Sequence, residues 1–96
     1  MKKSHVYILE CADGSYYIGS TKNLQRRLLQ HQLGEGAKYT QKRLPVKLVY
    51  AEEYDLVKDA FYREKQLQGW SRLKKVALIK GNFELLKALS NKQNNF

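Results

Sequence analysis

The chain has 96 residues, of which 43% are hydrophobic, and this combination fits one domain with a single modest core rather than two domains or a disordered chain. Eighteen Lys and Arg residues against nine Asp and Glu residues give a formal net charge of +9, which favours a polyanionic partner, nucleic acid first, over a merely soluble basic protein. No apolar run approaches the length of a membrane span, and no signal-peptide core follows the first residues. The single cysteine, Cys11, has no disulfide partner in the chain. We therefore expect a cytoplasmic protein.

Residues 5–11 form the first predicted strand. This stretch is apolar on both faces, so we expect both faces to be covered. Cys11, at its end, is expected to be a small buried hydrophobe. Residues 12–15 predict a turn and residues 15–19 predict a returning strand, so the two strands should form a hairpin.

The length of the hairpin loop decides which side chains share a face. A two-residue loop would put Tyr7 and Tyr17 on opposite faces of the sheet. A three-residue loop with Gly14 in the left-handed conformation would place Leu9 opposite Tyr17 and Tyr7 opposite Gly19. Both tyrosines would then share one face, and Gly19 would leave room for the Tyr7 ring. We expect the three-residue loop.

A first helix is expected to start at an Asn23 cap and to end near Gly34. At about 100° per residue, the predicted buried arc consists of Leu24, Leu28, Leu29 and Leu33, while Arg26 and Gln30 point toward water. Arg27 and His31 lie one turn apart along one border of this arc. An arginine and a histidine at the edge of a core, beside a tyrosine-bearing strand, indicate a functional site. The alternative is an ordinary amphipathic helix with polar margins.

Residues 34–45 lack helical or strand periodicity and are expected to form a loop, and a loop this long is often functional. The loop carries Lys38, Tyr39, Lys42 and Arg43, a mixture suited to phosphates and exposed bases. Lys22, just before the first helix, joins this predicted nucleic-acid-binding set. The alternative is a solvated basic loop.

The remaining elements are a strand and three helices. Residues 46–54 predict the third strand. Asp55 is expected to cap a helix that runs to Gln68 and stops at Gly69. Ser71 is expected to cap a helix over residues 72–80 that stops at Gly81, and Asn82 a short helix over residues 83–89. A single domain over residues 1–90 is thus predicted, followed by a frayed polar tail over residues 91–96.

Glu64 interrupts the apolar stripe of its predicted helix. The stripe consists of Val57, Ala60, Phe61 and Leu67. A carboxylate on this core-facing side is costly unless it is paired, hydrogen-bonded or bound to a metal. Two explanations stay open: an ion pair with a basic neighbour such as Arg27, or a ligand for a hard divalent cation such as Mg²⁺.

These residues together resemble the GIY-YIG nuclease superfamily, and in particular its small stand-alone bacterial members of the YhbQ-like kind. The resemblance rests on Val6-Tyr7, Tyr17-Ile18-Gly19, Arg27 and His31 on one helix, and Glu64 on a later one. It covers roughly residues 6–81, including residues 34–40 and 63–67. His5 departs from the pattern, since the family has glycine there. The resemblance implies an α+β (α/β) GIY-YIG endonuclease-like fold, with a three-stranded antiparallel sheet flanked by about four helices.

The resemblance also implies divalent-metal-dependent hydrolysis of phosphodiester bonds in DNA. Glu64 would bind Mg²⁺ or Mn²⁺, and Arg27 would neutralise charge that develops on the phosphoryl oxygens. Tyr7 or Tyr17 would deprotonate or orient the attacking water, while His31 would position that water or tune the phenol. We expect this set to meet around one pocket open to solvent.

The sequence also bears on the substrate, on further site residues and on partners. Structured or damaged DNA, as in DNA repair, is the expected substrate, cut with low sequence specificity because so small a chain has little surface for reading sequence. Asn82 joins the predicted nucleic-acid-binding set and is the candidate for a polar residue that completes the site in several family members. An unknown protein partner could supply targeting. The alternative function is a non-catalytic module that binds DNA or RNA through the same basic surface.

Overall fold

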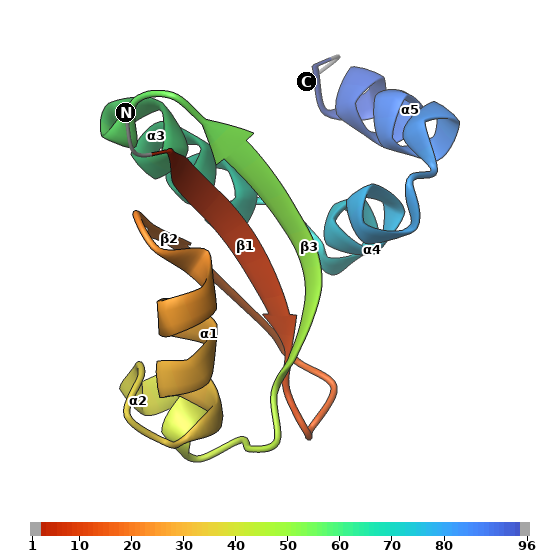
Figure 1. Ribbon diagram of the computed structural model, residues 1–96. Helices are drawn as coiled ribbons and strands as arrows, with labels where there is room; N and C mark the ends of the chain where they lie inside the picture. The colour runs from red at the N-terminus through yellow and green to blue at the C-terminus, as the bar shows by residue number, and fades with distance from the viewer. Residues whose placement is uncertain (1–2, 95–96) are drawn as a thin grey trace.

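Figure 1 shows the computed structural model, which describes residues 3–94. The elements in chain order are β1 (Ser4–Glu10), β2 (Tyr16–Thr21), α1 (Leu24–Gln32), α2 (Lys38–Gln41), β3 (Lys47–Tyr54), α3 (Val57–Gln68), α4 (Arg72–Lys80) and α5 (Phe83–Asn94). The strands form one antiparallel sheet in the order β2-β1-β3. The predicted α+β class and three-stranded antiparallel sheet are confirmed, with five helices in the described part of the chain where about four were expected.

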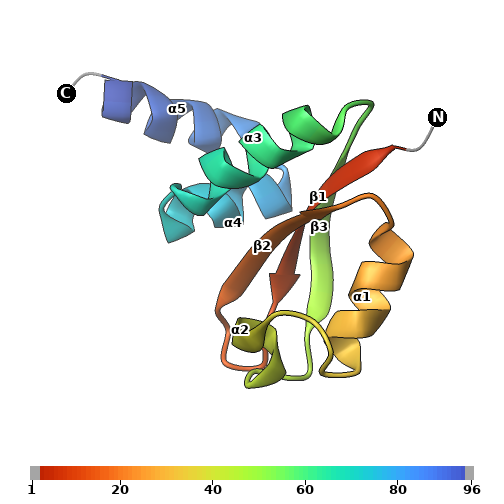
Figure 2. The same cartoon turned by 90° about the vertical axis from the view of Figure 1, so that its left-hand side faces the viewer.

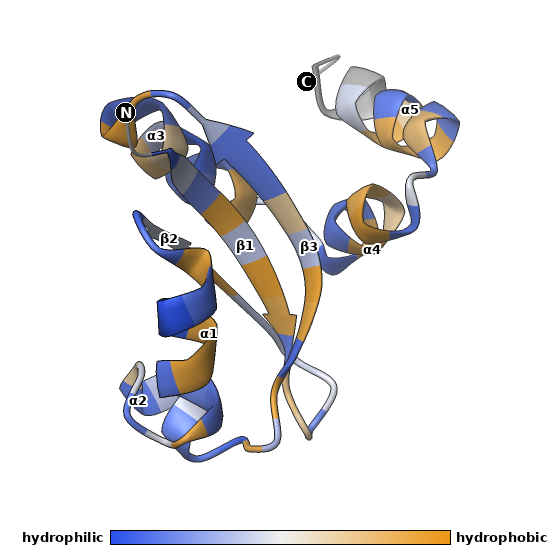
Figure 3. Cartoon of the chain, in the orientation of Figure 1, coloured by the Kyte–Doolittle hydropathy of each residue, from blue (hydrophilic) through white to orange (hydrophobic). Residues whose placement is uncertain are grey.

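Helices cover both faces of the sheet, and β1 is packed on both sides. On one face the even-numbered residues of the hairpin pack against α3 and α4; this cluster is Val6, Ile8, Ile18, Ala60, Leu67 and Leu78. On the other face Tyr7 and Leu9 pack with Cys11, Val46 and the partly buried leucines of α1. In Figure 3 hydrophobic colour accordingly gathers along the middle of β1 and β3. The predicted coverage of the first strand on both faces is confirmed, as is the burial of Cys11, which is 4% exposed.

The hairpin has the predicted three-residue loop. Tyr7 lies opposite Gly19, and Leu9 lies opposite Tyr17. Gly14 has a φ of +84°, a left-handed value that favours glycine. Because side chains alternate between faces along a strand, Tyr7 and Tyr17 project from the same face of the sheet.

Most of the predicted helix ends are confirmed. The Asn23 side chain accepts a hydrogen bond from the Arg26 N–H at 3.0 Å, and Ser71 caps α4 in the same way. The predicted cap at Asp55 is wrong, since the chain turns into α3 at Leu56 and the Asp55 carboxylate pairs with Lys3 instead.

Two expectations about helix lengths are also corrected. The stretch over residues 34–45 contains α2, a helix of four residues that is too short to show a periodic pattern. The last helix, α5, continues to Asn94 instead of ending at residue 89. Of the predicted tail, residues 95–96 lie outside the described residues, and the division into a domain and a tail stays a prediction.

Among the helices over residues 3–94, none combines the length and apolarity needed to cross a bilayer.

The buried face of α1 differs from the predicted arc. His31 is only 1% exposed and is the buried residue of this helix. Leu24 and Leu28 pack partly buried against the core, whereas Leu29 and Leu33 are 55% and 62% exposed. The helix therefore rests on the sheet through the side that carries Leu24, Leu28 and His31, and a histidine occupies the space against Tyr7.

Candidate active site

A buried chain of hydrogen bonds joins β1, α1 and α2. Tyr7 Oη lies 2.8 Å from His31 Nε2, and His31 Nδ1 lies 2.9 Å from Thr40 Oγ1. The Thr40 hydroxyl donates its one hydrogen to the Ala37 carbonyl oxygen at 2.9 Å. Thr40 must then accept from His31 Nδ1–H, which leaves the lone pair of Nε2 to accept the Tyr7 hydroxyl. His31 is therefore a neutral imidazole that acts as the hydrogen-bond acceptor of Tyr7.

Two glycines make room for this chain. A Cβ added at Gly36 would lie 2.3 Å from His31 Nδ1, and a Cβ added at Gly19 would lie 2.5 Å from Tyr7 Oη. Neither glycine has a positive φ, so the requirement is for space and not for backbone conformation. The predicted role of Gly19 in leaving room for the Tyr7 ring is confirmed.

Tyr17 extends the cluster toward the surface. Its ring centroid lies 5.2 Å from that of His31 and 6.4 Å from that of Tyr7. Its outer side stacks on Tyr39 of α2, with centroids 6.1 Å apart and planes inclined by 30°. The Arg43 guanidinium lies 3.7 Å above the Tyr39 ring and completes a layered edge to the site.

Charge and burial set the protonation of these groups. Burial and the neighbouring Arg27 charge lower the pKa of His31 below 6.5, so its imidazole is neutral at pH 7. Burial, with Tyr17 and Glu64 nearby, raises the pKa of Tyr7 well above 10, against the opposing effect of Arg27. Burial and then Glu64 also raise the pKa of Tyr17 above 10, again against Arg27. Both phenols are therefore protonated at neutral pH, and Arg27 acts on all three rings.

Glu64 is half-buried and is held by neutral donors. The Ser20 hydroxyl donates to Glu64 Oε1 at 2.5 Å, and Gln68 Nε2 donates to Glu64 Oε2 at 2.8 Å. Among the described side chains, those of residues 3–90, no ion pair of 4.0 Å or less joins Glu64 to a basic group. The alternative of a structural bridge between Glu64 and Arg27 is therefore wrong.

The site is arranged around the free edge of β2. α3 covers the face of the sheet opposite to α1, and Figure 2 looks onto the edge strand with α3 above it and α2 below. Tyr7, Tyr17 and His31 thus belong to one face, and Glu64 approaches from the other. The expected single pocket is corrected to an edge site. The pKa values of Tyr7 and Tyr17 nevertheless respond to the Glu64 charge, so the groups act on one another electrostatically.

The residues at this edge fit a hard divalent cation. Carboxylate oxygens are the ligands that such ions prefer. Over the described side chains, the Glu64 carboxylate accepts from Ser20 and Gln68 and forms no ion pair with a basic group. Nowhere in the described range do three or more His, Cys, Asp or Glu side chains gather as a metal cluster. A cation at Glu64 would therefore complete its shell with water and phosphate oxygens, the arrangement that Mg²⁺ commonly adopts.

The chain can now be compared with known proteins. Residues 3–77 match the family described as the GIY-YIG catalytic domain. The chain belongs to the GIY-YIG family. Membership connects it to the GIY-YIG nuclease family, which suggests a nucleic-acid substrate.

Its relatives and structural neighbours are small proteins of similar length. The UPF0213 protein SSP2268 of Staphylococcus saprophyticus is 46% identical over 79 residues, which cover 82% of this chain and 96% of the relative. A UPF0213 protein of Syntrophus aciditrophicus is 48% identical over 85 residues, covering 88% and 98%. The solution NMR structure of the UPF0213 protein BH0048 from Bacillus halodurans superposes with a TM-score of 0.54 at 41% identity, covering 81% of this chain and 83% of that one. The NMR structure of EF2693 from E. faecalis gives a TM-score of 0.58 at 36% identity, covering 88% and 90%.

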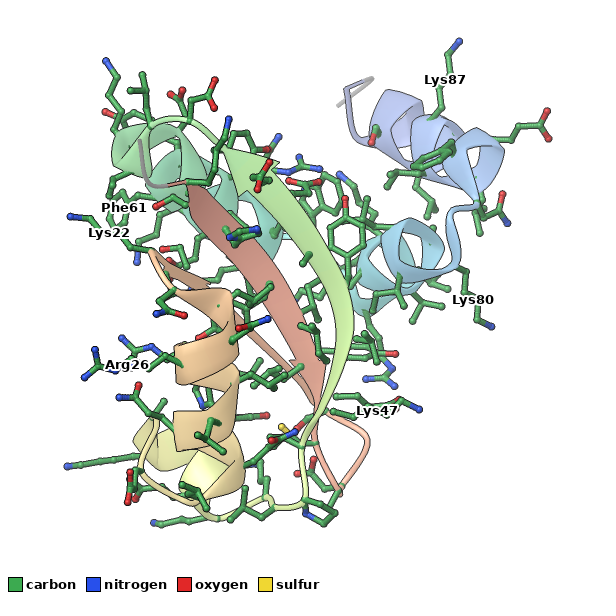
Figure 4. All side chains as sticks on the ribbon, in the orientation of Figure 1. Lys22, Arg26, Lys47, Phe61, Lys80 and Lys87 are labelled. Atoms are coloured by element: carbon green, nitrogen blue, oxygen red, sulfur yellow. The ribbon has the colours of Figure 1, made fainter. Side chains whose placement is uncertain are left out.

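The predicted nucleic-acid-binding residues fall into two groups. Lys22 lines a hollow of about 350 Å³ beside the start of α1, together with Arg26 and the site residue Arg27. Figure 4 shows Lys22 and Arg26 on the same side of the molecule, pointing away from the sheet. Lys38 and Lys42 are exposed on and next to α2.

Two residues of the predicted set have structural partners. Arg43 Nε pairs with the Asp13 carboxylate of the hairpin turn at 3.1 Å, so this guanidinium fastens the loop to the sheet as well as covering Tyr39. Asn82 lies between α4 and α5, where its side chain accepts the Leu85 N–H at 3.2 Å. Its predicted cap is therefore confirmed, while its role in completing the site stays a prediction.

Four further residues belong to the site in the structure but were not predicted from the sequence: Gly36, Thr40, Ser20 and Gln68. Gly36 and Thr40 lie in the 34–40 stretch, where a glycine outside a turn signals a close approach of the backbone to another group. Gln68 lies one turn after Glu64 and so shares its helix face, which could have indicated a partner.

Proposed function

We propose that this protein is a divalent-metal-dependent endonuclease that hydrolyses phosphodiester bonds in structured or damaged DNA with low sequence specificity. The observation that carries the proposal is the buried chain from Tyr7 through His31 to Thr40, set beside Arg27 and Glu64. At the edge of β2, His31 provides a proton acceptor, Arg27 a cation and Glu64 a carboxylate. Phosphodiester hydrolysis requires groups of these three kinds.

Tyr7 is the proposed general base. A phenol with a raised pKa is a weak proton donor to solvent, but Tyr7 already donates to the neutral Nε2 of His31. As the Tyr7 oxygen takes a proton from the attacking water, its own proton passes to His31, so no free phenolate has to accumulate. The lowered pKa of His31 keeps the acceptor unprotonated at neutral pH. Thr40 accepts Nδ1–H, which orients the ring and stabilises the imidazolium as it forms.

Arg27 and Glu64 handle the charge of the phosphate. The planar Arg27 guanidinium donates to phosphoryl oxygens as negative charge builds on them, where a fork of donors stabilises more than a point charge. Glu64 would hold Mg²⁺ or Mn²⁺, which, when bound, neutralises phosphate charge and stabilises the leaving oxygen. The hydrogen bonds from Ser20 and Gln68 fix the direction of the Glu64 carboxylate.

The basic hollow beside α1 supports the choice of a nucleic-acid substrate. Lys22, Arg26 and Arg27 line one hollow, and Arg27 also belongs to the site. A phosphate backbone bound in this hollow would therefore lie next to the site. Contacts of this kind position a strand without reading its bases. Low intrinsic sequence specificity follows from this.

A cleavage assay tests the proposal. Wild-type protein is incubated with nicked, flapped, single-stranded and fully paired random-sequence DNA in Mg²⁺ or Mn²⁺, beside Glu64→Gln and the matched control Glu84→Gln on α5. We expect cleavage by the wild type and the control, and binding without cleavage by Glu64→Gln. Binding without cleavage by the wild type on every substrate would support the non-catalytic module instead. Nicking confined to one short sequence would contradict the low specificity.

A further inference from the structure

A second hollow lies against the same free edge of β2. It has a volume of about 230 Å³, and its walls are Tyr16, Tyr17, Ile18, Tyr39, Gln68 and Lys75. α2 contributes Tyr39 from one face of the sheet, whereas Gln68 and Lys75 come from the helices on the other face (Figure 2). The hollow adjoins the active site because Tyr17 packs against His31 and Gln68 donates to Glu64.

The aromatic walls of this hollow are backed by cations. Tyr39 stacks on Tyr17 and carries the Arg43 guanidinium 3.7 Å from its ring centroid. Tyr16, on the other side of β2, carries the Arg72 guanidinium at 4.6 Å. Flat rings accompanied by cations are the means by which proteins stack single bases while holding the adjacent phosphates.

The backbone of β2 adds hydrogen-bonding groups to the hollow. The Ser15 carbonyl points inward and accepts from Cys11, whereas the Ile18 carbonyl points outward and accepts from Gln68 at 3.3 Å. Backbone groups alternate in direction along an antiparallel strand, so Tyr16 and Ile18 both direct their N–H and C=O away from β1. In the sheet order β2-β1-β3, over the described residues, no strand pairs with this edge. These outward-directed groups belong to two residues that line the hollow.

We propose that this hollow binds one unpaired nucleobase of the DNA substrate, next to the phosphodiester that is cut. The proposal rests on the proposed nuclease function and deepens it by naming the substrate class: strands that present an unpaired base, such as flaps, bulges and single strands. The volume is below the range of about 300–1,000 Å³ usual for small-molecule sites and suits one ring system, not a base pair. An extended peptide could also pair with a free strand edge, but the cation-backed rings and Lys75 favour a flat ligand with negative charge.

Binding without metal tests the site independently of cleavage. The probe is a DNA duplex with one central unpaired 2-aminopurine, compared in EDTA with the same duplex in which that base is paired to thymine. We expect the unpaired probe to bind at least tenfold more tightly and its fluorescence to be quenched by stacking. Tyr39→Leu should reduce this preference about tenfold, equivalent to about 1.4 kcal/mol and within the range of one base–aromatic stack.

Two variants control for folding and for general effects. Tyr39→Phe keeps the ring and should keep the preference. Tyr62→Leu makes the same substitution at a tyrosine of α3 that is 67% exposed and lies outside the hollow, and it should leave both affinities unchanged. Melting temperatures identify any variant that fails to fold.

The outcomes separate the two proposals. Equal affinity of the wild type for the two probes overturns the base site. The base site is also overturned if Tyr39→Leu still prefers the unpaired probe, or if this variant loses affinity equally for both probes. Displacement of the unpaired probe by an extended neutral peptide would assign the edge to peptide binding. A protein that prefers the unpaired probe but cuts nothing with Mg²⁺ or Mn²⁺ refutes the nuclease function alone, and one that cuts without this preference refutes the base site alone.

Discussion

Replacing Gly36 with alanine tests the fit between the 34–40 loop and the buried histidine. The added Cβ would lie 2.3 Å from His31 Nδ1, and ordinary van der Waals contact starts at 3.4 Å, so ring and loop must separate by about 1.1 Å. His31 cannot yield freely, because Tyr7 and Thr40 hold its two ring nitrogens at 2.8 and 2.9 Å. A separation of this size breaks at least one of these two hydrogen bonds.

The expected cost follows from overpacking and from the broken hydrogen bond. Overpacking a tight core costs about 1–3 kcal/mol, and a buried polar group left without its partner costs about 1–3 kcal/mol more. We therefore expect Gly36→Ala to lower the free energy of unfolding by roughly 2–6 kcal/mol. In a domain of this size the lower end of that range corresponds to a fall of about 8–16 °C in melting temperature. Cleavage should fall as well, because Tyr7 loses its proton acceptor.

Gly69→Ala is the matched control. Gly69 ends α3 with a φ of −82°, and an added Cβ would meet its nearest neighbour at 3.5 Å, an ordinary contact. This variant should be within about 1 kcal/mol of the wild type, since alanine also reduces the entropy of the unfolded chain. Urea titration of both variants and the wild type measures the difference. Equal stability of Gly36→Ala and Gly69→Ala would refute the reasoning.

Three further predictions concern the hydrogen-bond chain and the basic surface. Thr40→Val should impair cleavage and lower the free energy of unfolding by about 1–3 kcal/mol, because His31 Nδ1–H loses its acceptor. Thr40→Ser keeps the hydroxyl and should retain cleavage and stability. Chemical denaturation and cleavage rates compare the two variants. Burial and Arg27 lower the pKa of His31, so the neutral ring contributes its full stability above about pH 6.5, and this contribution is lost as the pH falls through the lowered pKa. NMR titration should show the imidazole protonating below pH 6.5. Protonation at or above that pH would contradict the burial argument. The affinity for DNA should fall steeply with salt, and replacing Lys22 and Arg26 together with alanine should reduce the slope of log K against log[salt] by about 1.4–1.8; a flat wild-type titration would count against any nucleic-acid role.

Local signals in the sequence were sufficient for most of the fold. The position of Gly14 and the alternation of Tyr7, Leu9 and Tyr17 determine the hairpin register, because a slip of one residue would move every side chain to the other face. Asn23 and Ser71 cap helices through their own side chains, which is a local interaction. The cap expected at Asp55 failed because a distant residue, Lys3, takes its carboxylate.

The errors arise where tertiary contacts decide between local alternatives. Helical periodicity places Leu29 and His31 toward opposite borders of the predicted arc, roughly 160° apart. Contact with Tyr7 determines that the border with the histidine is the buried one. Arg27, His31 and Glu64 were recognisable because each borders or interrupts an apolar pattern. Tyr7 and Tyr17 were recognisable because the hairpin register places them on one face. The arrangement of this set around an edge was not recognisable, because that depends on the sheet order β2-β1-β3 and on α3 packing on the face opposite to α1. Thr40 lacked any signal of its own, since an isolated threonine in a loop is ordinary.

The most direct test compares single-turnover cleavage of a flapped DNA in Mg²⁺ by the wild type, Tyr7→Phe and Tyr17→Phe, with binding measured in parallel. Only the first variant removes the hydroxyl that donates to His31. The account predicts that the wild type cleaves, that Tyr7→Phe loses at least about 100-fold in rate as expected for a general base, and that Tyr17→Phe loses far less. A wild-type protein that binds this DNA without cutting it, or a Tyr7→Phe variant that cuts at the wild-type rate, would contradict it.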